Sequence, residues 1–333
     1  MTLAVAATVA CKKETTPKTE GPQAQKVNLT VRIEDPMATK ATGIKGDATD
    51  EEKVNTLQVF VFNGETIDGY GTTENATSLN IGCTVGSREI YALANTPDLR
   101  SVTSKTELLG MISRLGNDVT NFEMIGIKSE DISAGTETVT ISVDRLASRV
   151  VVKKVTNALT SPALKEQDFV LKSMFLTNVA TDVDYGLSGN HVVENWYNKM
   201  AYSSADNSLG NMIYDEIEEA LEDGHSHDTE HCFYAYPNSS AHSTSLTWSP
   251  RSTMLVLKIM IGETLYDYPI LLPALENNRS YEIDEIKITR PGNKDDGLEG
   301  GTDEQEPVEG KDCSFTIIVN PWTTTAITEG TTI

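Results

Sequence analysis

Hydrophobic and polar residues alternate with a period of two in many short segments of this chain, which is typical of half-buried β-strands. The first such segment is residues 26–34, where every second residue is apolar: Val27, Leu29, Val31 and Ile33. Asp35-Pro36 ends the segment, and a polar stretch that contains Lys40 and Lys45 follows. The pattern predicts a strand with one buried face and a cleavable connection after it.

The same pattern returns near the C-terminus, where the alternating apolar residues are Cys313, Phe315, Ile317 and Val319 and the run ends at Trp322. Two strands with one pattern could fill the same apolar groove, one from the subunit itself and one from a neighbour, which is donor-strand complementation. A protease that cut at an intervening lysine would free the groove. The alternative is that both are ordinary strands of one fold.

Further strands are predicted between these two, together with two helices. Residues 54–63 place three aliphatic side chains on one face and two phenylalanines on the other, which indicates a strand buried on both faces. A helix is expected at 104–115, where Ser104 and Glu107 form a capping box, and another at 210–222. Two strand-rich halves suggest a mainly β protein of two sandwiches, with domains at 26–147 and 148–333.

Acidic and glycine-rich residues dominate 292–312, which we expect to be a solvated, mobile linker to a terminal strand segment at 311–333. The whole chain of 333 residues has a net charge of −22 and a pI near 4.6. This charge argues against a nucleic-acid partner, because no basic surplus would neutralise phosphates. A basic island at 145–154 is expected to be a solvated strand face or an inter-domain set of ion pairs.

The first eleven residues, MTLAVAATVAC, resemble the end of a bacterial lipoprotein signal, in which a small residue precedes the lipidated cysteine. This predicts lipidation at Cys11, with residues 1–25 as signal and tether; a frayed N-terminus is the alternative. The remaining cysteines, Cys83, Cys232 and Cys313, are expected to be small buried hydrophobes, with one pairing left open.

Only one cluster has residues of the kinds that bind metals, namely His225, His227, His231 and Cys232. Its spacing matches no standard site, and a loop leading into a strand is the preferred interpretation, so we predict no metal and no cofactor. No phosphate loop, dinucleotide fingerprint or nucleophile elbow is present in the sequence. We therefore expect no enzyme activity.

The order of several segments resembles the fimbrillins of Bacteroidales, the FimA-type major fimbrial subunits or type V pilins. The segments are VNTLQVFVFN (54–63), REIYALAN (88–95), RLASRVVVKKV (145–155), Tyr236-Pro237-Asn238, NRSYEIDEIKITRPG (278–292) and residues 315–322. The resemblance implies two transthyretin-like Greek-key sandwiches with a few short helices. It also implies a lipoprotein precursor, an outer-membrane or extracellular fimbrial location, and subunits that polymerise by strand exchange.

Carried onto this chain, the resemblance makes 26–34 the displaced strand and 311–333 the donor, with Phe315, Ile317, Val319 and Trp322 as its apolar residues. The family is usually cut after arginine, but no arginine lies between Arg32 and Arg88. A trypsin-like protease that cuts after Lys40 or Lys45 is expected instead. The implied partners are further copies of the chain, accessory fimbrial subunits, and the outer membrane through the precursor's lipid.

Two alternatives stay open. An anchor or accessory subunit would keep its first strand and its lipid permanently. A surface lipoprotein that binds glycans or proteins would carry clustered aromatic side chains on its loops. Trp196 and Tyr197 are the only adjacent candidates, and we expect them to cover a core edge.

Overall fold

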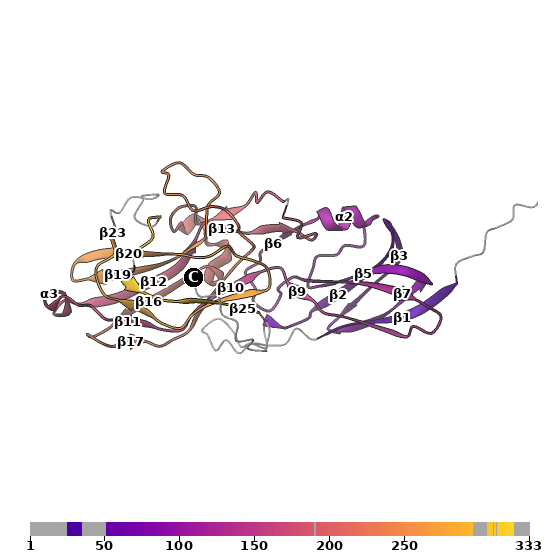
Figure 1. The fold of residues 1–333 in the computed structure, drawn as a ribbon, viewed down its shortest axis with the longest axis horizontal. Helices are drawn as coiled ribbons and strands as arrows, with labels where there is room; N and C mark the ends of the chain where they lie inside the picture. The colour runs from indigo at the N-terminus through magenta and orange to yellow at the C-terminus, as the bar shows by residue number, and fades with distance from the viewer. Residues whose placement is uncertain are drawn as a thin grey trace, which may run out of the picture.

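The computed structural model describes residues 25–34, 51–189, 191–295, 305–308, 310 and 312–322, with side chains throughout except at 205–207. Figure 1 shows an elongated molecule with the early strands at one end and the later strands at the other. The described residues are mainly β, with only short helices: α2 (Lys105–Gly110), α3 (Pro162–Lys165) and the 3-10 helix η1 (Ser204–Met212). The predicted fold class is confirmed.

Two sheets form a sandwich at the N-terminal end. The larger has the order β3-β2-β5-β7-β9 and the smaller has the order β4-β1-β8. Their bounds are β1 (Lys26–Ile33), β2 (Thr56–Asn63), β3 (Thr66–Glu74), β4 (Ser78–Thr84), β5 (Gly86–Ala94), β7 (Met124–Ile132), β8 (Thr138–Ile141) and β9 (Asp144–Arg145). The two sheets bury one apolar core between them.

Strand β2 is buried on both faces, as its pattern predicts. Leu57, Val59 and Val61 lie in the sandwich core. Phe60 and Phe62 lie on the opposite face and belong to a second core that extends into the other half of the molecule. Because the side chains of a strand alternate between faces, one short segment joins both cores.

The C-terminal half contains three main sheets, of order β18-β10-β21-β25, β17-β11-β22-β24 and β16-β12-β19-β20-β23. Their bounds are β10 (Ser148–Val152), β11 (Val155–Asn157), β12 (Phe169–Thr177), β16 (Tyr214–Ala220), β17 (Ser226–His227), β18 (His231–Ala235), β19 (Met254–Ile261), β20 (Thr264–Leu271), β21 (Arg279–Ile283), β22 (Ile286–Ile288), β23 (Asn293–Lys294), β24 (Cys313–Ser314) and β25 (Ile317–Pro321). Two small ladders pair β13 (Val179–Ala180) with β15 (Trp196–Tyr197) and β14 (Asp182–Asp184) with β6 (Ile112–Arg114).

The chain leaves the N-terminal sandwich between β9, which pairs with β7, and β10, which pairs with β18 and β21. The predicted limit at 147/148 falls in this interval. The domain limits themselves stay a prediction, because the second core is continuous from Phe60 to Trp322 across both halves.

Two helix predictions need correction. Residues 210–222 are not a helix: η1 ends at Met212, and β16 then pairs with β12 as an edge strand. The apparent helical spacing arises because a 3-10 turn is followed by a strand whose glutamates, at 216, 218 and 219, are exposed to solvent. At 104–115 only Lys105–Gly110 is helical, with Ser104 as its N-cap, and the chain then enters β6.

The acidic linker also departs from its prediction in the parts that the structure describes. Gln305 is fully buried and bonds to Asn178, and the Val308 amide donates to Pro269 O at 3.0 Å. The Asn293 side chain donates to Glu306 O at 2.7 Å. An acidic segment can therefore follow the sheet edge when its backbone groups are satisfied there.

Candidate functional site

Strand β1 occupies an inner position of the smaller N-terminal sheet. It pairs antiparallel with β4 over seven residue pairs and parallel with β8 over four. Leu29, Val31 and Ile33 point into the core and are at most 1% exposed, while Val27 packs against the same core from its edge. The predicted alternation of buried and exposed residues is confirmed for this strand.

The solvent-facing side of β1 makes only light polar contacts, such as the Thr30 hydroxyl to Asn80 Oδ1 at 2.8 Å. Its backbone is satisfied on both sides: Thr30 N donates to Glu137 O, and Ile33 N donates to Thr77 O. Burying each of its three apolar side chains stabilises the fold by about 1.5–3 kcal/mol. Loss of β1 would therefore open an apolar groove with unpaired backbone on both walls.

The predicted lipidation site, Cys11, and the predicted cleavage sites, Lys40 and Lys45, lie outside the described residues. The described chain stops at Glu34 and resumes at Glu51. These three predictions therefore remain predictions.

The C-terminal strand lies in its own subunit as an edge strand. β25 pairs antiparallel with β21 from Arg279–Pro321 to Ile283–Ile317, and β24 pairs with β22. Ile317 is 5% exposed and Trp322 is fully buried. Phe315 and Val319 are half-buried and pack against the main core. β25 is therefore folded into its own subunit. Within this strand and the residue after it, the buried positions are Ile317 and Trp322.

Glu51 anchors the end of this strand through a buried group of five side chains, which we call the junction cluster: Glu51, Arg145, Arg149, Tyr234 and Trp322. Arg149 Nη1 lies 2.8 Å from Glu51 Oε2, and Trp322 Nε1 donates to the same oxygen at 3.1 Å. The Tyr234 hydroxyl donates to Glu51 Oε1 at 2.5 Å. One carboxylate therefore holds three donors from three distant parts of the chain.

Arg145 closes the cluster from the other side. Its Nε donates to the backbone oxygen of Glu51 at 3.1 Å, and its Nη1 donates to the backbone oxygen of Trp322 at 3.2 Å. Both guanidinium groups lie over the indole ring, at 4.7 Å for Arg145 and 5.1 Å for Arg149. The π face of the ring compensates part of the second positive charge, because the cluster has two arginines and one carboxylate.

Aromatic packing completes the setting of Trp322. Its ring stacks on Tyr234 with centroids 5.8 Å apart and meets the edge of Phe122 at 5.5 Å. Burial lowers the pKa of Arg145 to about 10, an effect that the charge of Glu51 opposes. Burial and the nearby carboxylate of Glu51 raise the pKa of Tyr234, so its hydroxyl remains a donor at neutral pH.

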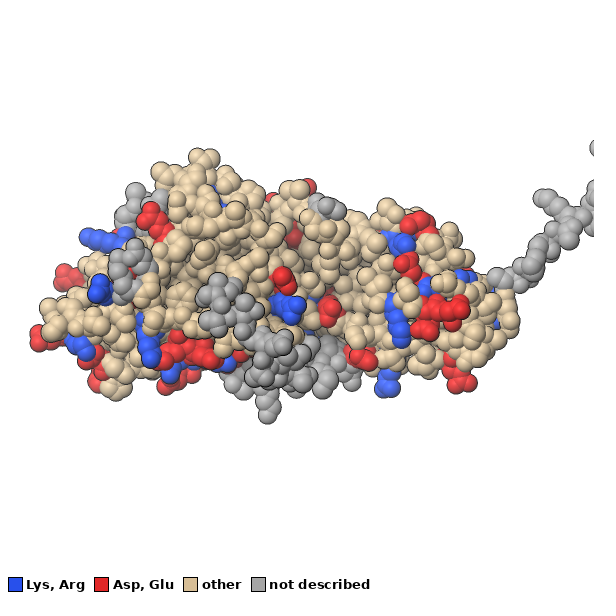
Figure 2. Space-filling model, viewed as in Figure 1, with Lys and Arg blue, Asp and Glu red and all other residues tan. Residues whose placement is uncertain are grey.

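The basic island of the sequence divides into two parts. Its arginines enter the junction cluster, whereas Lys153 pairs at the surface with Glu282 and Asp284, at 3.0 and 2.8 Å. Lys154 pairs with Glu285 at 3.2 Å. Figure 2 shows acidic and basic side chains side by side at both ends of this face. The two alternatives of the sequence analysis therefore apply to different parts of this segment: Arg149 pairs with Glu51 of the N-terminal half, whereas the lysines form surface ion pairs within the C-terminal half.

The histidine cluster forms a chain of hydrogen bonds. His231 Nδ1 lies 2.8 Å from Asp215 Oδ2, His231 Nε2 lies 2.8 Å from His227 Nε2, and His227 Nδ1 lies 2.6 Å from Glu219 Oε2. This chain joins β16 to β17 and β18. Among the described residues, no group of three or more His, Cys, Asp or Glu side chains is arranged to hold a metal ion.

The three remaining cysteines are buried and carry free thiols. They behave as the small hydrophobes that the sequence analysis expected. In the described part of the chain, no helix has the length and apolar character needed to cross a membrane.

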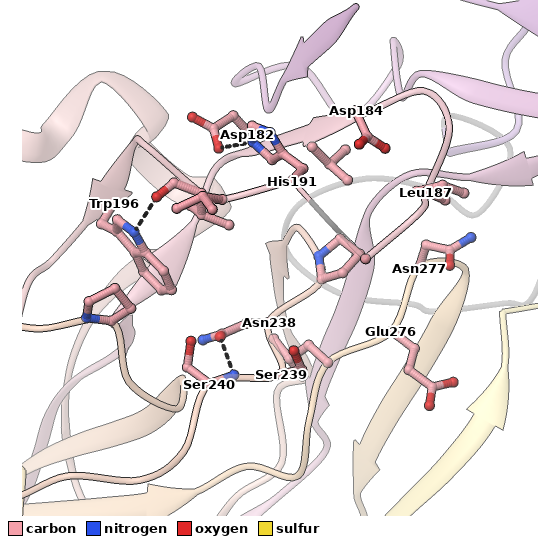
Figure 3. A pocket seen from close by; sticks show the side chains of 17 residues that line it. Asp182, Asp184, Leu187, His191, Trp196, Asn238, Ser239, Ser240, Glu276 and Asn277 are labelled. Atoms are coloured by element: carbon pink, nitrogen blue, oxygen red, sulfur yellow. Dashed lines mark hydrogen bonds and ion pairs between the residues drawn. The ribbon is translucent and has the colours of Figure 1, made fainter. Parts of the chain in front are cut away.

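A pocket of about 440 Å³ lies where β14, the loop before β15 and the segment after β18 meet. Figure 3 shows Asp182, His191 and Trp196 on one side and Asn238 and Ser240 opposite them. Asp182 is buried, and its carboxylate is occupied by His191 Nε2 at 2.9 Å and by the amides of Glu194 and Asn195 at 3.1 and 2.9 Å. The carboxylate of Asp182 is therefore engaged by groups of the protein itself, where it fixes the loop before β15.

Trp196 is only 8% exposed, and its Nε1 donates to Val193 O at 3.1 Å. Tyr197 is half-buried and packs against the main core, as expected. Trp196 instead meets the ring of the half-buried loop residue Trp248 edge-on, with centroids 5.7 Å apart. Because Trp196 itself is buried, it offers no open aromatic platform.

Sequence comparison with known proteins points to one family. Residues 26–180 match the family model described as major fimbrial subunit protein (FimA). Two curated relatives, both called major fimbrium subunit FimA type-2 of Porphyromonas gingivalis, are 35% identical over 101 residues and 37% identical over 97. Over residues 26–180 this chain is therefore similar in sequence to the FimA fimbrial subunits. The matches cover 29% and 28% of this chain and 24% and 23% of the curated proteins, about a quarter of their length.

Solved structures resemble this chain over nearly the whole fold. A fimbrilin (FimA) from Porphyromonas gingivalis has a TM-score of 0.62 at 15% identity, covering 90% of this chain and 98% of its own. A Bacteroides eggerthii protein assigned to cell adhesion has a TM-score of 0.66 at 20% identity, covering 91% and 98%. A tip fimbrial protein from Porphyromonas gingivalis reaches 0.52 at 13% identity, covering 88% and 98%. At such identities the likeness establishes a common fold.

Sequence reasoning found both terminal strands but missed the junction cluster. Glu51 is separated from Arg149 by 98 positions and from Trp322 by 271. The only sequence signal for it is the pair of arginines four residues apart in an otherwise acidic chain.

Proposed function

We propose that this chain is a structural subunit of a cell-surface fimbria that supports adhesion. The precursor would be exported as a lipoprotein attached to the outer membrane at Cys11 and cut by a trypsin-like protease after Lys40 or Lys45. Subunits would then polymerise by donor-strand exchange. The relationship to the FimA subunits supports this proposal, and the inner position of β1 carries its mechanism.

The mechanism follows from what removing β1 would do. An inner strand leaves two sheet edges and an apolar groove behind it, and both favour association with an incoming strand. While β1 fills the groove, premature assembly is blocked. A cut in the connection between Ile33 and β2 would make the strand's departure possible without breaking any other element of the sandwich.

The C-terminal segment 311–333 is the proposed donor. Both strands of this segment are edge strands, so when it leaves, β25 loses its pairing with β21 and β24 loses its pairing with β22. Its alternating apolar residues would replace those of β1 in the groove of a neighbouring subunit. A shift of one residue would present the polar Ser314 and Thr316 instead, so the pattern also fixes the register.

Limited trypsin digestion of the purified precursor tests this proposal, with N-terminal sequencing and electron microscopy of the products. We expect cutting after Lys40 or Lys45, loss of residues 26–34, and growth of filaments that resist SDS. Lys40→Gln together with Lys45→Gln should abolish the cut. The control Lys128→Gln, at a lysine on β7, should leave it unchanged.

A peptide of residues 311–333 tests the donor role separately. Added to freshly cut monomer, it should occupy the groove and stop filament growth. The same peptide carrying Ile317→Asp and Val319→Asp should not. A chain that is cut and stays monomeric, or that resists cutting, would instead favour the anchor subunit that retains its first strand.

A further inference from the structure

The junction cluster joins the two segments that strand exchange must mobilise. Glu51 is the first described residue after β1 and its connection, and Trp322 is the last described residue of the C-terminal strand. Glu51 Oε2 accepts the indole N–H of Trp322 at 3.1 Å. The exposed fractions of the two residues are 5% and 0%. The residue that follows the N-terminal connection is therefore bonded directly to Trp322 of the proposed donor.

We propose that the junction cluster is a latch that holds β25 in its own subunit until the connection before Glu51 is cut. This inference rests on the proposed function and adds its regulation: one cleavage both frees β1 and releases the donor. The latch consists of described side chains only, namely those of Glu51, Arg145, Arg149, Tyr234 and Trp322.

The chain is fixed in place just downstream of Glu51. The Asn95 side chain donates to Lys53 O at 2.7 Å, and Asn95 Oδ1 accepts the amide of Asn55 at 2.8 Å. The chain is thus pinned from Lys53 onward, independently of anything before it. Glu51 lies upstream of this pin, and in the uncut precursor it is held between the pin and β1.

Cutting changes the position of Glu51 in the chain. After a cut at Lys45 the new N-terminus is Gly46, and Glu51 becomes the sixth residue of a free end. Chain ends fray unless they are tied down, because each ordered residue loses conformational entropy. The same cut ends the covalent link from Glu51 back to β1, so the junction cluster must then hold Glu51 without that link.

The junction cluster depends on the carboxylate of Glu51, which bonds to three of its other members. Glu51 is the partner of Arg149 at 2.8 Å, of Tyr234 at 2.5 Å and of Trp322 at 3.1 Å. When it leaves, two buried guanidinium groups face each other and the indole ring without the carboxylate. Removing one member of a buried charge pair is strongly destabilising because the other charge stays desolvated. Outward movement of Trp322 would let water reach both arginines.

Trp322 is the residue that contributes most to keeping β25 in place. Within this strand and the residue after it, only Ile317 and Trp322 are buried. The Trp322 amide donates to Asn278 O at 2.8 Å, which closes the ladder at this end. Movement of Trp322 out of the junction cluster would therefore release β25 from its C-terminal end toward Ile317. A neighbouring subunit could then capture the released end.

Hydrogen exchange of the β25 amides, followed by mass spectrometry on monomer isolated by gel filtration, tests the latch. We expect exchange at 317–321 to be at least about tenfold faster after the trypsin cut than before it. Uncut Glu51→Gln should exchange about as fast as cut wild type. Trp322→Phe, which keeps an aromatic ring but loses the indole N–H, should lie between the two.

A matched control separates release of β25 from general destabilisation. Asp68→Asn breaks another shielded ion pair, Asp68–Arg88 at 2.8 Å, in the N-terminal sandwich. It should leave β25 exchange unchanged. Equal exchange before and after cutting, or an equal rise in Asp68→Asn and Glu51→Gln, would overturn the latch. If Glu51→Gln fails to fold, β25 exchange in the cut wild type and in Trp322→Phe still tests the latch.

Polymerisation, measured on the same samples, keeps the two proposals apart. Filaments that grow although cutting leaves β25 exchange unchanged would reject the latch and keep strand exchange. Faster β25 exchange without filaments would keep the latch as a property of the subunit and reject strand exchange.

Discussion

Strands β1 and β25 have the same alternating pattern in the sequence, yet the fold uses them in opposite ways. β1 is an inner strand with partners on both sides, β4 and β8. β25 is an edge strand with one partner, β21. Three apolar side chains of β1 are buried in an apolar core, whereas the hold on β25 is concentrated at Ile317 and at a tryptophan set among charges.

This difference indicates how each strand can be released. An inner strand covalently joined at its end can depart only after a cut, because leaving breaks two ladders and exposes a core. An edge strand loses one ladder, and a polar cluster can be undone by removing one partner. The alternation of apolar residues in a strand thus indicates which other strand it can replace. Its inner or edge position in the sheet indicates how it is released.

The largest expected effect separates Trp322 from the rest of β25. Trp322→Ala should lower the free energy of unfolding by about 3–5 kcal/mol, since it empties a fully buried site. Val319→Ala, at a half-buried position of the same strand, should cost less than about 1 kcal/mol. Urea unfolding of both variants measures the ratio. Similar losses would show that the hold on β25 is spread along the strand.

The next effect tests whether the hold on β1 is spread evenly. Leu29→Ala and Ile33→Ala should each cost about 2–5 kcal/mol in urea unfolding, because both side chains lie in one dry core. Thr30→Ala, on the outer face between them, should change stability by less than about 0.5 kcal/mol. Two unequal core losses would mean that β1, like β25, depends on one residue.

Asp68 tests the acid sensitivity of the wall beside β1. Burial acts to raise the pKa of this carboxyl, but hydrogen bonds from Thr84 of β4 and from Arg88 prevail and hold the pKa below its usual value. Its contribution to stability is therefore present above the unfolded pKa, about 3.9, and is lost as pH falls through the lower folded pKa.

Asp68→Asn should accordingly destabilise the sandwich at pH 7 by about 1–3 kcal/mol, since Arg88 loses its charged partner. The loss should shrink towards pH 2. Thermal unfolding of the variant and wild type across this range measures it. A difference that stays constant with pH would show that packing, and not the charge, is responsible.

The fold could be predicted largely from the sequence because alternation reports burial directly. The two-faced burial predicted for residues 54–63 is observed in β2, and the alternating burial predicted for residues 26–34 is observed in β1. Strand β3 was missed because its glycines hide the pattern. A side chain at Gly69 would meet Gly82 O at 2.5 Å, so close packing against β4 excludes the hydrophobic residue that would mark a strand.

The candidate site could be predicted only in part. The sequence indicates which residues of β1 and β25 are apolar, but alternation is the same for an inner and an edge strand. The position of Glu51 beside Trp322 depends on the whole fold, because no local pattern relates residues 271 positions apart. The helix expected at 210–222 fails for a similar reason: pairing of β16 with β12 outweighs local spacing.

The smallest effect concerns a charge near the junction that has no counterpart in the β1 groove. Glu123 accepts the Tyr185 hydroxyl at 2.6 Å, and burial raises the pKa of this carboxyl despite that hydrogen bond. A raised folded pKa contributes stability below the unfolded pKa, about 4.3, and that contribution is lost as pH rises through the folded pKa.

Glu123→Gln keeps an acceptor for Tyr185 without the charge. It should therefore be more stable than wild type at pH 7, by about 1 kcal/mol, and nearly equal at pH 4. Glu130→Gln, farther along β7, should show no such pH-dependent gain in the same thermal unfolding series. If Glu123→Gln were no more stable at pH 7 than at pH 4, relative to wild type, the junction would be as insensitive to pH as the apolar groove.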